Sequence, residues 1–392
     1  MIVGVDASCW SNRRGYGRFT RELLRAMVAV DHRNEYMFFL DPQADAGGDL
    51  PEGATRIVVP TSEPPARAAS ASGRRRLADV WAFSRRVARE PLDVMFYPSV
   101  YTFFPLLRRV RAVVTIHDVI PERFPELVFP DRRSRFFWRA KLYVATRQAS
   151  AILTVSEHSR AGILRYFRVR GSRVRVVHEA PSRLFRPLGD QGVGAGMLAR
   201  YRLAVGDRYI LYLGGMSPHK NLPTLLEVYA RLVRDPELAE VKLVLGGDVQ
   251  GDVFHSHYSV LEALVGRLEI QDRVTFAGFV EDEELLHLYN GADAVVLPSF
   301  DEGFGLPAIE AAACGVPVVA SSTGALPELL EEAGLFVDPY RPPELLDALR
   351  RLLKDGALRK ELGERGLLRA REFSWERSAA QVVALLAEVA GG

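Results

Sequence analysis

The chain has 392 residues, enough for two domains of ordinary size, and its 48% hydrophobic and 26% charged residues are typical of a globular protein. No apolar run approaches the ~20 residues that a membrane-spanning helix needs, so an integral membrane protein is not expected. Residues 1–190 carry 32 Lys and Arg against 19 Asp and Glu, and subtraction from the totals of 51 and 49 leaves 19 against 30 in residues 191–392. Halves of opposite charge indicate two domains with different partners.

The N-terminus and the cysteines bear on the location of the protein. Residues 1–6 are predicted to be a strand and are not a basic region followed by a cleavage site, so no signal peptide is expected. Cys9 and Cys314 lie in apolar segments, which excludes a disulfide framework. We therefore expect a cytoplasmic protein, with the inner face of the membrane as a second expected location.

Residues 1–188 are expected to form a first α/β domain. Strands are predicted at residues 2–7, 36–40, 55–59, 94–97, 112–116, 151–155 and 173–177. Helices are predicted at residues 18–30, 74–89, 132–148 and 157–167, the last with Ser156 as its N-cap. Residues 12–17 are expected to be a glycine loop and residues 60–73 a mobile loop, and three prolines in residues 121–130 argue against a regular helix there.

Residues 189–196 are glycine-rich and polar, so they are expected to link this domain to a second one at residues 197–374. Its strands are predicted at residues 209–213, 242–245, 274–277, 294–297 and 317–320. Its helices are predicted at residues 221–233, 256–267, 282–290, 307–314 and 342–353, followed by a helical tail that breaks before a final helix capped by Ser374. The alternation predicts two Rossmann-like domains with parallel sheets, facing each other across a cleft.

Residues 294–321 carry the first chemical signal, because they are predicted to run strand, glycine loop, helix, strand. Gly303 and Gly305 let backbone amides approach a ligand, and the start of the following helix suits phosphate. Glu302 and Glu310, eight residues apart, suit the hydroxyls of a sugar and a ribose. This combination predicts a nucleotide-sugar site.

A second signal follows the first strand of the second half, where Gly214 and Gly215 precede Lys220 and a helix. Paired glycines and a lysine before a helix form a phosphate-binding arrangement. It is not a P-loop, because no Ser or Thr follows Lys220 to hold magnesium. A lone lysine is more often a solvated surface residue, but the glycine pair favours a diphosphate ligand.

The order of these motifs resembles glycosyltransferase family 4, whose members are retaining, nucleotide-sugar-dependent enzymes with the GT-B fold. The resemblance rests on residues 214–221 and 302–310 and continues through residues 15–20, 115–118, 155–159 and 373–375, so it covers nearly the whole chain. The Gly-Gly form before Lys220 is similar to that of polysaccharide mannosyl- and rhamnosyltransferases. The resemblance implies an acceptor-binding first domain, a donor-binding second domain and a final helix, residues 375–392, that crosses back onto the first.

The resemblance also implies a role for individual residues. Lys220 would hold the diphosphate, Glu302 the hydroxyls of the donor sugar, and His117 would line the reaction centre, which makes these three the expected catalytic residues. Glu310 would bind the ribose. Donor contacts are implied for Gly15, Tyr16, Gly17, Gly214, Gly215, Lys220, Gly278, Val280, Glu302, Gly303, Phe304, Gly305, Leu306 and Glu310.

One position departs from the family pattern. The family often has an arginine five residues before the lysine, where this chain has Gly215, and His219 or Arg18 are candidates to supply the missing charge. No Asp-x-Asp motif follows a strand, so neither a metal nor another cofactor is expected. Fixed cations and a helix N-terminus would instead stabilise the leaving diphosphate.

The resemblance predicts transfer of a sugar, with GDP-mannose as the preferred donor, to a glycan or a lipid-linked saccharide. A hydrolytic pair formed by Glu302 and Glu310 is a competing interpretation, but residues eight apart across a loop and a helix need not face one bond. A GT-B sugar-nucleotide epimerase or phosphorylase, and a non-catalytic nucleotide-sugar-binding protein, remain alternatives. The chain shows no cofactor lysine site typical of a phosphorylase. The presence of Glu302, Glu310 and Lys220 together argues against a non-catalytic protein.

Other features leave two interpretations open. The helix at residues 132–148 mixes aromatic and basic residues, so it is either packed with a solvated arginine face or in contact with anionic lipid, as Arg74–Arg76 and Arg108–Arg111 would favour. Nucleic acid is not an expected partner, because no recognition module is present.

His117 could be a hydrogen-bonded structural residue. Glu179, after a predicted strand, is a further candidate to face the cleft.

Overall fold

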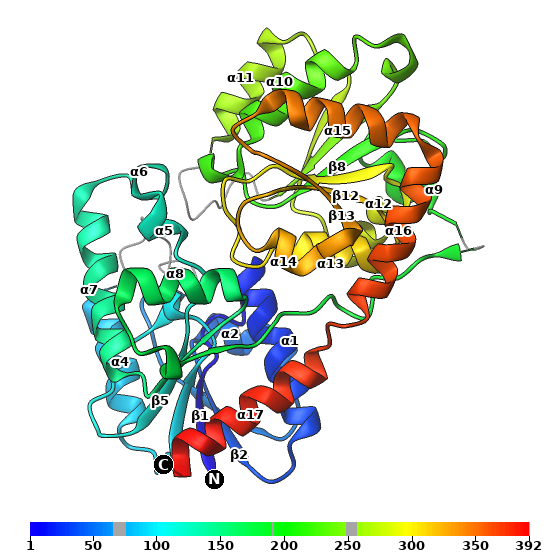
Figure 1. The fold of residues 1–392 in the computed structure, drawn as a ribbon. Coiled ribbons are helices and arrows are strands. Elements are labelled where there is room, and N and C mark those ends of the chain that lie inside the picture. Colours follow the sequence, from blue (N-terminus) through cyan, green and yellow to red (C-terminus); the bar gives the residue numbers. More distant parts are fainter. Residues whose placement is uncertain (66–75, 190–191, 248–256, 392) are drawn as a thin grey trace. The chain divides into compact units, whose positions relative to one another are not determined.

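The structure is a computed structural model that describes residues 1–65, 76–189, 192–247 and 257–391 (Figure 1). The chain divides into two compact units. Unit 1 comprises Met1–Glu179 and Ser374–Gly392, and unit 2 comprises Ala180–Phe373. Part of the loop expected at residues 60–73, Arg74, Arg75, His255 and part of the expected linker lie outside the described residues.

The described part of unit 1 contains a seven-stranded parallel sheet of order β3-β2-β1-β4-β5-β6-β7. The strands are β1 (Ile2–Asp6), β2 (Glu35–Leu40), β3 (Ala54–Val58), β4 (Val94–Tyr97), β5 (Arg111–Thr115), β6 (Ala151–Thr154) and β7 (Val174–Val176). Every residue of β4 and β6 is buried, as expected for parallel strands covered on both faces. The predicted parallel α/β sheet is therefore confirmed.

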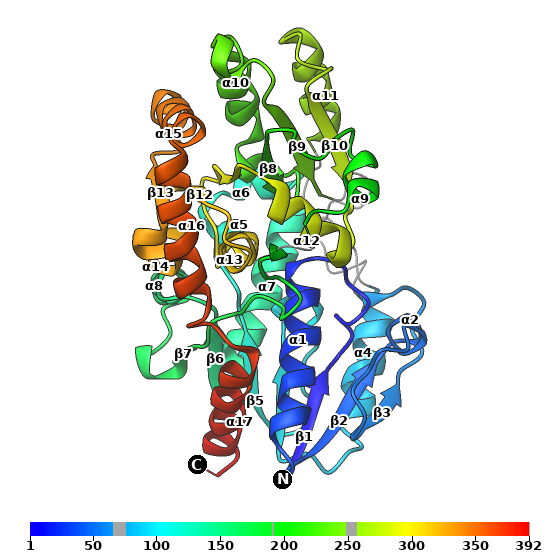
Figure 2. The ribbon, with the colours of Figure 1, turned by 90° about the vertical axis from the view of Figure 1, so that its right-hand side faces the viewer.

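The helices in the described part of unit 1 include the last one of the chain. They are α1 (Gly15–Val30), α2 (Pro42–Ala46), α4 (Leu77–Val87), α5 (Ile120–Arg123), α6 (Pro125–Val128), α7 (Arg132–Gln148), α8 (Glu157–Phe167) and α17 (Trp375–Gly391). Helix α17 packs along α1, and both termini lie at the same end of the unit (Figure 1, Figure 2). Arg111 at the start of β5 donates to the carbonyls of Val389 and Ala390, so the last turn of α17 is held on the sheet.

The described part of unit 2 contains a six-stranded sheet of order β10-β9-β8-β11-β12-β13, in which each pair of neighbouring strands is parallel. The strands are β8 (Tyr209–Leu213), β9 (Lys242–Gly246), β10 (Val274–Gly278), β11 (Ala294–Leu297), β12 (Val318–Ser321) and β13 (Gly334–Val337). The helices are α9 (Ala195–Ala199), α10 (Leu222–Leu232), α11 (Tyr258–Arg267), α12 (Asp282–Gly291), α13 (Leu306–Ala313), α14 (Leu326–Leu330), α15 (Pro342–Lys354) and α16 (Gly356–Ala370). The strand order reverses between β8 and β11, which is where open α/β sheets bind ligands.

The boundary between the units differs from the expected one. The chain passes from unit 1 to unit 2 after Glu179, and not in the segment 189–196. The reason is that the preceding residues dock on α12: Leu188 N–H donates to Asn290 Oδ1 at 2.8 Å, and Asn290 Nδ2 donates to Arg186 O at 3.0 Å. These contacts make residues 180–188 part of unit 2.

Three local expectations were wrong. Helix α1 begins at Gly15, so the expected glycine loop supplies its first turn, and a Cβ on Gly17 would collide with the carbonyl of Asn12. Pro121 is the second residue of the short helix α5 and Pro125 the first residue of α6, because a proline is tolerated in a first helical turn. Strand β13 was not predicted, since the apolar run at Gly334–Val337 is only four residues long and begins with a glycine.

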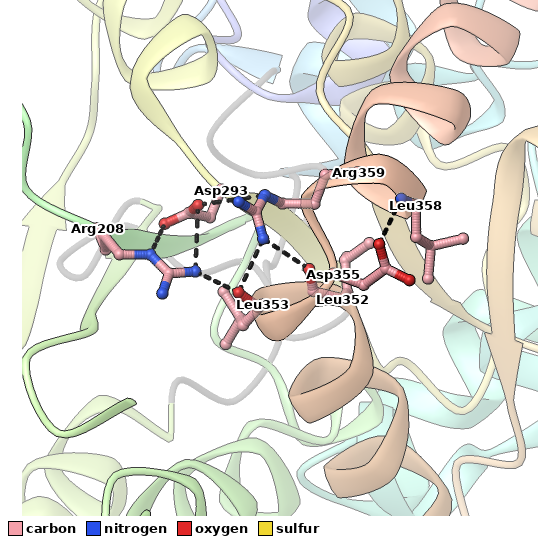
Figure 3. Close-up of polar contacts among 7 residues, drawn as sticks. All are labelled: Arg208, Asp293, Leu352, Leu353, Asp355, Leu358 and Arg359. Atoms are coloured by element: carbon pink, nitrogen blue, oxygen red, sulfur yellow. Dashed lines mark hydrogen bonds and ion pairs between the residues drawn. The ribbon is translucent and has the colours of Figure 1, made fainter. Parts of the chain in front are cut away.

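A polar cluster closes the amino-terminal edge of the unit 2 sheet (Figure 3). Asp293, directly before β11, pairs with Arg208 at 3.2 Å and with Arg359 at 3.5 Å. Both arginines also donate to Leu353 O at the end of α15, and Asp355 caps α16 through Leu358 N–H. The cluster lies at the opposite end of the strands from the predicted site, so we assign it to stability.

The described residues also bear on membrane and redox properties. In the part of the chain that the structure describes, no helix is both long and apolar enough to cross a bilayer. Cys9 and Cys314 are both buried and are not joined by a disulfide. Burial raises the pKa of the Cys314 thiol to about 12, which makes it unreactive.

Candidate active site

The predicted donor residues of unit 2 gather at the carboxyl ends of its strands. Lys220 follows β8 and Glu302 follows β11, the two strands between which the order reverses. Lys220 Nζ donates to both carboxylate oxygens of Glu302, at 2.7 and 2.9 Å. The side chains are 17% and 10% exposed, so this ion pair is largely shielded from water. The structure thus brings together two predicted residues that are 82 positions apart.

Backbone contacts explain why Lys220 and Glu302 meet. Phe300 N–H donates to His219 O at 2.8 Å, which joins the two loops directly. Asn221, in the left-handed region with φ of 58°, donates from Nδ2 to Pro298 O at 3.1 Å and to Pro339 O at 3.0 Å. The amide of Asn221 therefore ties the lysine loop to the segments that follow β11 and β13.

Glu302 itself is held in a fixed position. Ser299 Oγ donates to Glu302 Oε1 at 2.7 Å, and Ala325 N–H donates to Glu302 O at 3.0 Å. A Cβ on Gly324 would stand 2.6 Å from Glu302 N, so only glycine lets the two loops approach this closely. Because its backbone and side chain are both anchored, the carboxylate is held in place within unit 2.

Helix α13 begins beside this carboxylate. Gly305, with φ of 89°, precedes its first residue Leu306, and Pro307 occupies the first turn as predicted. Gly303 and Phe304 are buried in the same loop. The positive end of α13 is therefore next to Lys220 and Glu302, an arrangement that suits a bound phosphate group.

Glu310, the predicted ribose ligand, lies inside α13, and its side chain is buried. It is 1% exposed, and Tyr289 of α12 donates to its Oε2 at 3.0 Å. The tyrosine hydrogen bond orients the carboxyl group and partly offsets the cost of burying it. Tyr289 was not predicted, because nothing in the spacing between residues 289 and 310 indicates their contact.

The predicted glycines of unit 2 meet along the same sheet edge. Gly214 N–H donates to Gly246 O at 3.0 Å, and Gly247 N–H donates to Gly278 O at 2.8 Å. A Cβ on Gly247 would collide with Gly214 O, so the ends of β8, β9 and β10 are packed backbone against backbone. Val280 is buried beside Gly246. The segments that follow β8, β9 and β10 are thus adjacent in space.

The position of the missing arginine is not compensated by His219. Tyr212 Oη donates to Gly215 O at 2.6 Å, so this backbone is held by an aromatic residue. Burial, together with the neighbouring Lys220, holds the pKa of His219 well below its usual value of 6.5, so this side chain is neutral near pH 7. A neutral His219 does not favour it as the source of the missing positive charge, and the other candidate, Arg18, lies in α1 of unit 1.

The remaining predicted residues belong to unit 1. His117 follows β5 and is buried, with Nε2 3.1 Å from Pro98 O and Nδ1 3.5 Å from Glu179 Oε1. The ring of Phe19, from α1, meets His117 edge to face at 4.6 Å. The first turn of α1, which holds Gly15 and Gly17, and the histidine thus lie at the same edge of the sheet.

Tyr16, between these glycines, belongs to a packed aromatic group. Its ring stacks on Tyr101 at 4.9 Å, and Asn12 Nδ2 donates to its hydroxyl at 2.7 Å. Burial raises the pKa of Tyr16 well above its usual value, so the phenol stays neutral. In contrast, Gly15 is exposed, and no atom of the described residues lies within 4 Å of where its Cβ would stand.

Two supporting residues escaped the sequence prediction. Ser299 was not singled out, although a polar residue just after a buried strand is a general signal for a site at a sheet edge. Asn221 was noted only as part of a motif, and its bridging contacts need the tertiary structure. Among the described residues, no three His, Cys, Asp or Glu side chains form a group that could hold a metal ion.

Both halves of the chain match known families. Residues 13–180 match the family described as Glycosyltransferase Family 4, and residues 198–369 match the family described as Glycosyl transferases group 1. The chain is 36% identical to O-antigen chain mannosyltransferase B of Escherichia coli over 276 residues. This alignment covers 70% of each protein. The chain is 27% identical over 270 residues to the serotype-specific mannosyltransferase WbdA of Escherichia coli, which covers 69% of this chain and 32% of that longer protein.

Solved structures share the fold along the whole chain. Sucrose-phosphate synthase from Thermosynechococcus elongatus matches with a TM-score of 0.75 at 22% identity, over 99% of this chain and 98% of that one. Anabaena HepE in complex with UDP and glucose matches with a TM-score of 0.72 at 19% identity, over 98% and 99%. At these identities the likeness concerns the fold alone. From the family matches to both halves and the 36% identical relative, the chain belongs to glycosyltransferase family 4 and is a glycosyltransferase with the GT-B fold.

Proposed function

We propose that this glycosyltransferase moves a sugar from a nucleotide-sugar donor to a glycan or lipid-linked saccharide, with retention of anomeric configuration and without a metal ion. The observation that carries the proposal is the shielded Lys220–Glu302 pair beside the start of α13. A cation and a helix N-terminus suit the diphosphate, and a fixed carboxylate next to them suits the hydroxyls of the attached sugar.

The proposed reaction follows from this charge arrangement. The bond between the anomeric carbon and the diphosphate oxygen breaks, and negative charge grows on the leaving diphosphate. Lys220 and the amides at the start of α13 stabilise that charge, while Glu302 holds the sugar. The acceptor hydroxyl attacks from the face that the diphosphate leaves, and its proton passes to the leaving phosphate oxygen.

Mannose is the sugar that we propose, with GDP-mannose as donor. The support is that the relatives of Escherichia coli named above are mannosyltransferases, one of them for the O-antigen chain. The test is calorimetric titration with a panel of nucleotides and nucleotide-sugars, followed by transfer assays with each donor that binds. Tight binding of GDP-mannose and formation of a mannosylated glycan are expected, and a preference for UDP-glucose would contradict the choice of donor.

Product analysis separates this proposal from its alternatives. An epimerase would convert the nucleotide-sugar without forming a glycan, and a phosphorylase would need inorganic phosphate. A non-catalytic protein would bind the donor and release it unchanged. Transfer should persist in EDTA, and loss of activity that Mn²⁺ restores would refute the metal-free mechanism.

We also propose that α7 brings unit 1 to an anionic membrane surface, where a lipid-linked acceptor would lie. Phe136, Phe137 and Tyr143 are 67%, 63% and 61% exposed, although they are large apolar side chains. Exposed arginines surround them on the same helix, at positions 132, 133, 135, 139 and 147. Trp138, Leu142 and Ala145 anchor the opposite face on the protein. Aromatic residues among arginines suit the interface of an anionic bilayer.

Flotation with lipid vesicles tests this surface. Binding to vesicles that contain phosphatidylglycerol, weakened by salt and by the double substitution Phe136→Ser and Phe137→Ser, is expected. Leu368→Ser is a matched control, because Leu368 is equally exposed, at 64%, on unit 2. Absence of salt-sensitive binding would leave the arginines as ordinary surface charge.

A further inference from the structure

Glu179 is a buried acidic residue that the proposed reaction does not use. It is 6% exposed and is the last residue of unit 1 before the chain enters unit 2. Among the described residues, its side chain pairs with His117, whose Nδ1 lies 3.5 Å from Glu179 Oε1. A buried carboxylate is costly unless it is paired, so His117 is the group that makes this position tolerable.

The other contacts of His117 define the state of its ring. Nε2 lies 3.1 Å from Pro98 O, which can only accept, so Nε2 carries a hydrogen. Nδ1 faces the carboxylate of Glu179, and the ring of Phe19 closes a third side. Since both nitrogens face oxygen atoms of the protein, these contacts fix the orientation of the ring.

The backbone that carries Glu179 is anchored to α17. Ser378 Oγ donates to His178 O at 2.6 Å, and Trp375, at the start of α17, packs against Phe19 with ring centroids 5.8 Å apart. The chain leaves unit 1 after Glu179 and returns to it at Ser374. Within unit 1, both crossing points are therefore tied to the group of residues around His117.

We propose that Glu179 is a positioning residue for sugar transfer, which holds the imidazole of His117 at the end of β5 and links it to the chain connection between the units. The proposal rests on the proposed function, because it assumes that His117 lines the reaction centre. In this proposal the effect of Glu179 on transfer passes through its contact with His117. A displaced reaction-centre group lowers kcat more than it changes the KM for the donor.

The test is a double-mutant cycle with Glu179→Gln, His117→Ala and both together. Glu179→Gln is expected to lower kcat ~10–100-fold with the donor KM within ~2-fold, as for a lost transition-state contact. In the His117→Ala background it should cost no more than ~2-fold, because both substitutions remove the same interaction. Glu388→Gln is the control, since it removes an acid of the same unit that is 64% exposed.

A wild-type kcat in Glu179→Gln, or losses that multiply in the double variant, would overturn the proposal. A second measurement does not depend on transfer. The ¹⁵N resonances of the His117 imidazole, assigned with the His117→Ala variant, should change in Glu179→Gln and stay unchanged in Glu388→Gln. Unchanged resonances in Glu179→Gln refute the positioning role, whereas a wild-type protein that transfers no sugar refutes only the proposed function.

Discussion

The substitution Glu302→Gln is predicted to strengthen the binding of a nucleoside diphosphate and to weaken sugar transfer. In the structure, Lys220 donates to both oxygens of Glu302 at 2.7 and 2.9 Å. A diphosphate without its sugar must therefore compete with a carboxylate for the same cation. Glutamine keeps the shape of the side chain and an acceptor for Ser299, but it removes the competing charge.

The size of the effect follows from the geometry of the ion pair. Two unit charges ~3 Å apart attract by ~5 kcal/mol at an effective dielectric constant of ~20, and desolvation reduces the net value to roughly 1–3 kcal/mol. The side chains are only 17% and 10% exposed, so solvent screens this interaction weakly. Removal of the competition should tighten diphosphate binding ~5–150-fold. Transfer should fall ~10²-fold, because the amide holds the donor hydroxyls less strongly.

Calorimetric titration with GDP and UDP measures the first effect, and steady-state kinetics with the full donor measures the second. Lys220→Met should lose both binding and transfer, and Glu237→Gln is a control because Glu237 is a 73% exposed acid of the same unit. The unpaired lysine should also lower the Tm of Glu302→Gln, and the diphosphate should restore it. Unchanged or weaker diphosphate binding by a folded Glu302→Gln variant would show that Lys220 does not receive the diphosphate.

Three further predictions concern other parts of the molecule. Lys220→Ala and Glu302→Ala should each lower kcat/KM by at least ~10²-fold, and near-normal transfer by either variant would remove the proposed site. Burial raises the pKa of Glu122 to about 7 from its usual 4.5, so the stability that this group contributes is fully present below pH 4.5 and is lost as the pH rises through 7. Urea unfolding should accordingly show Glu122→Gln gaining about 2–3 kcal/mol relative to wild type between pH 4.5 and pH 8, and an equal difference at both pH values would contradict this. Asp293→Ala should destabilise unit 2 by about 1–3 kcal/mol, because it leaves Arg208 and Arg359 without their shared carboxylate, while kcat at low temperature should be unchanged; a normal Tm would refute this role.

Local sequence determined most of the elements, because their signals are contained within a few residues. The bounds of α7 and β8 coincide with the predicted ones, since each is a single run with a clear pattern. Ser156 caps α8 by accepting from Ser159 N–H, as predicted, because a cap is set by residues three apart. Strand β13 was missed because it is short and only partly buried. It is a strand only because it pairs with β12, and that pairing is not visible in the local sequence.

The order of the motifs in the sequence also determined the family and the fold, since the spacing of Lys220, Glu302 and Glu310 is contained in the chain itself. Only the tertiary structure decided which of these groups touch. The pairing of Lys220 with Glu302, the neutral state of His219 and the contact of His117 with Glu179 depend on segments far apart in the chain and on their burial. The same is true of the unit boundary at Glu179, because contacts with α12 assign residues 180–188 to unit 2. Contacts and burial of this kind arise only when the strands assemble, so no local pattern records them.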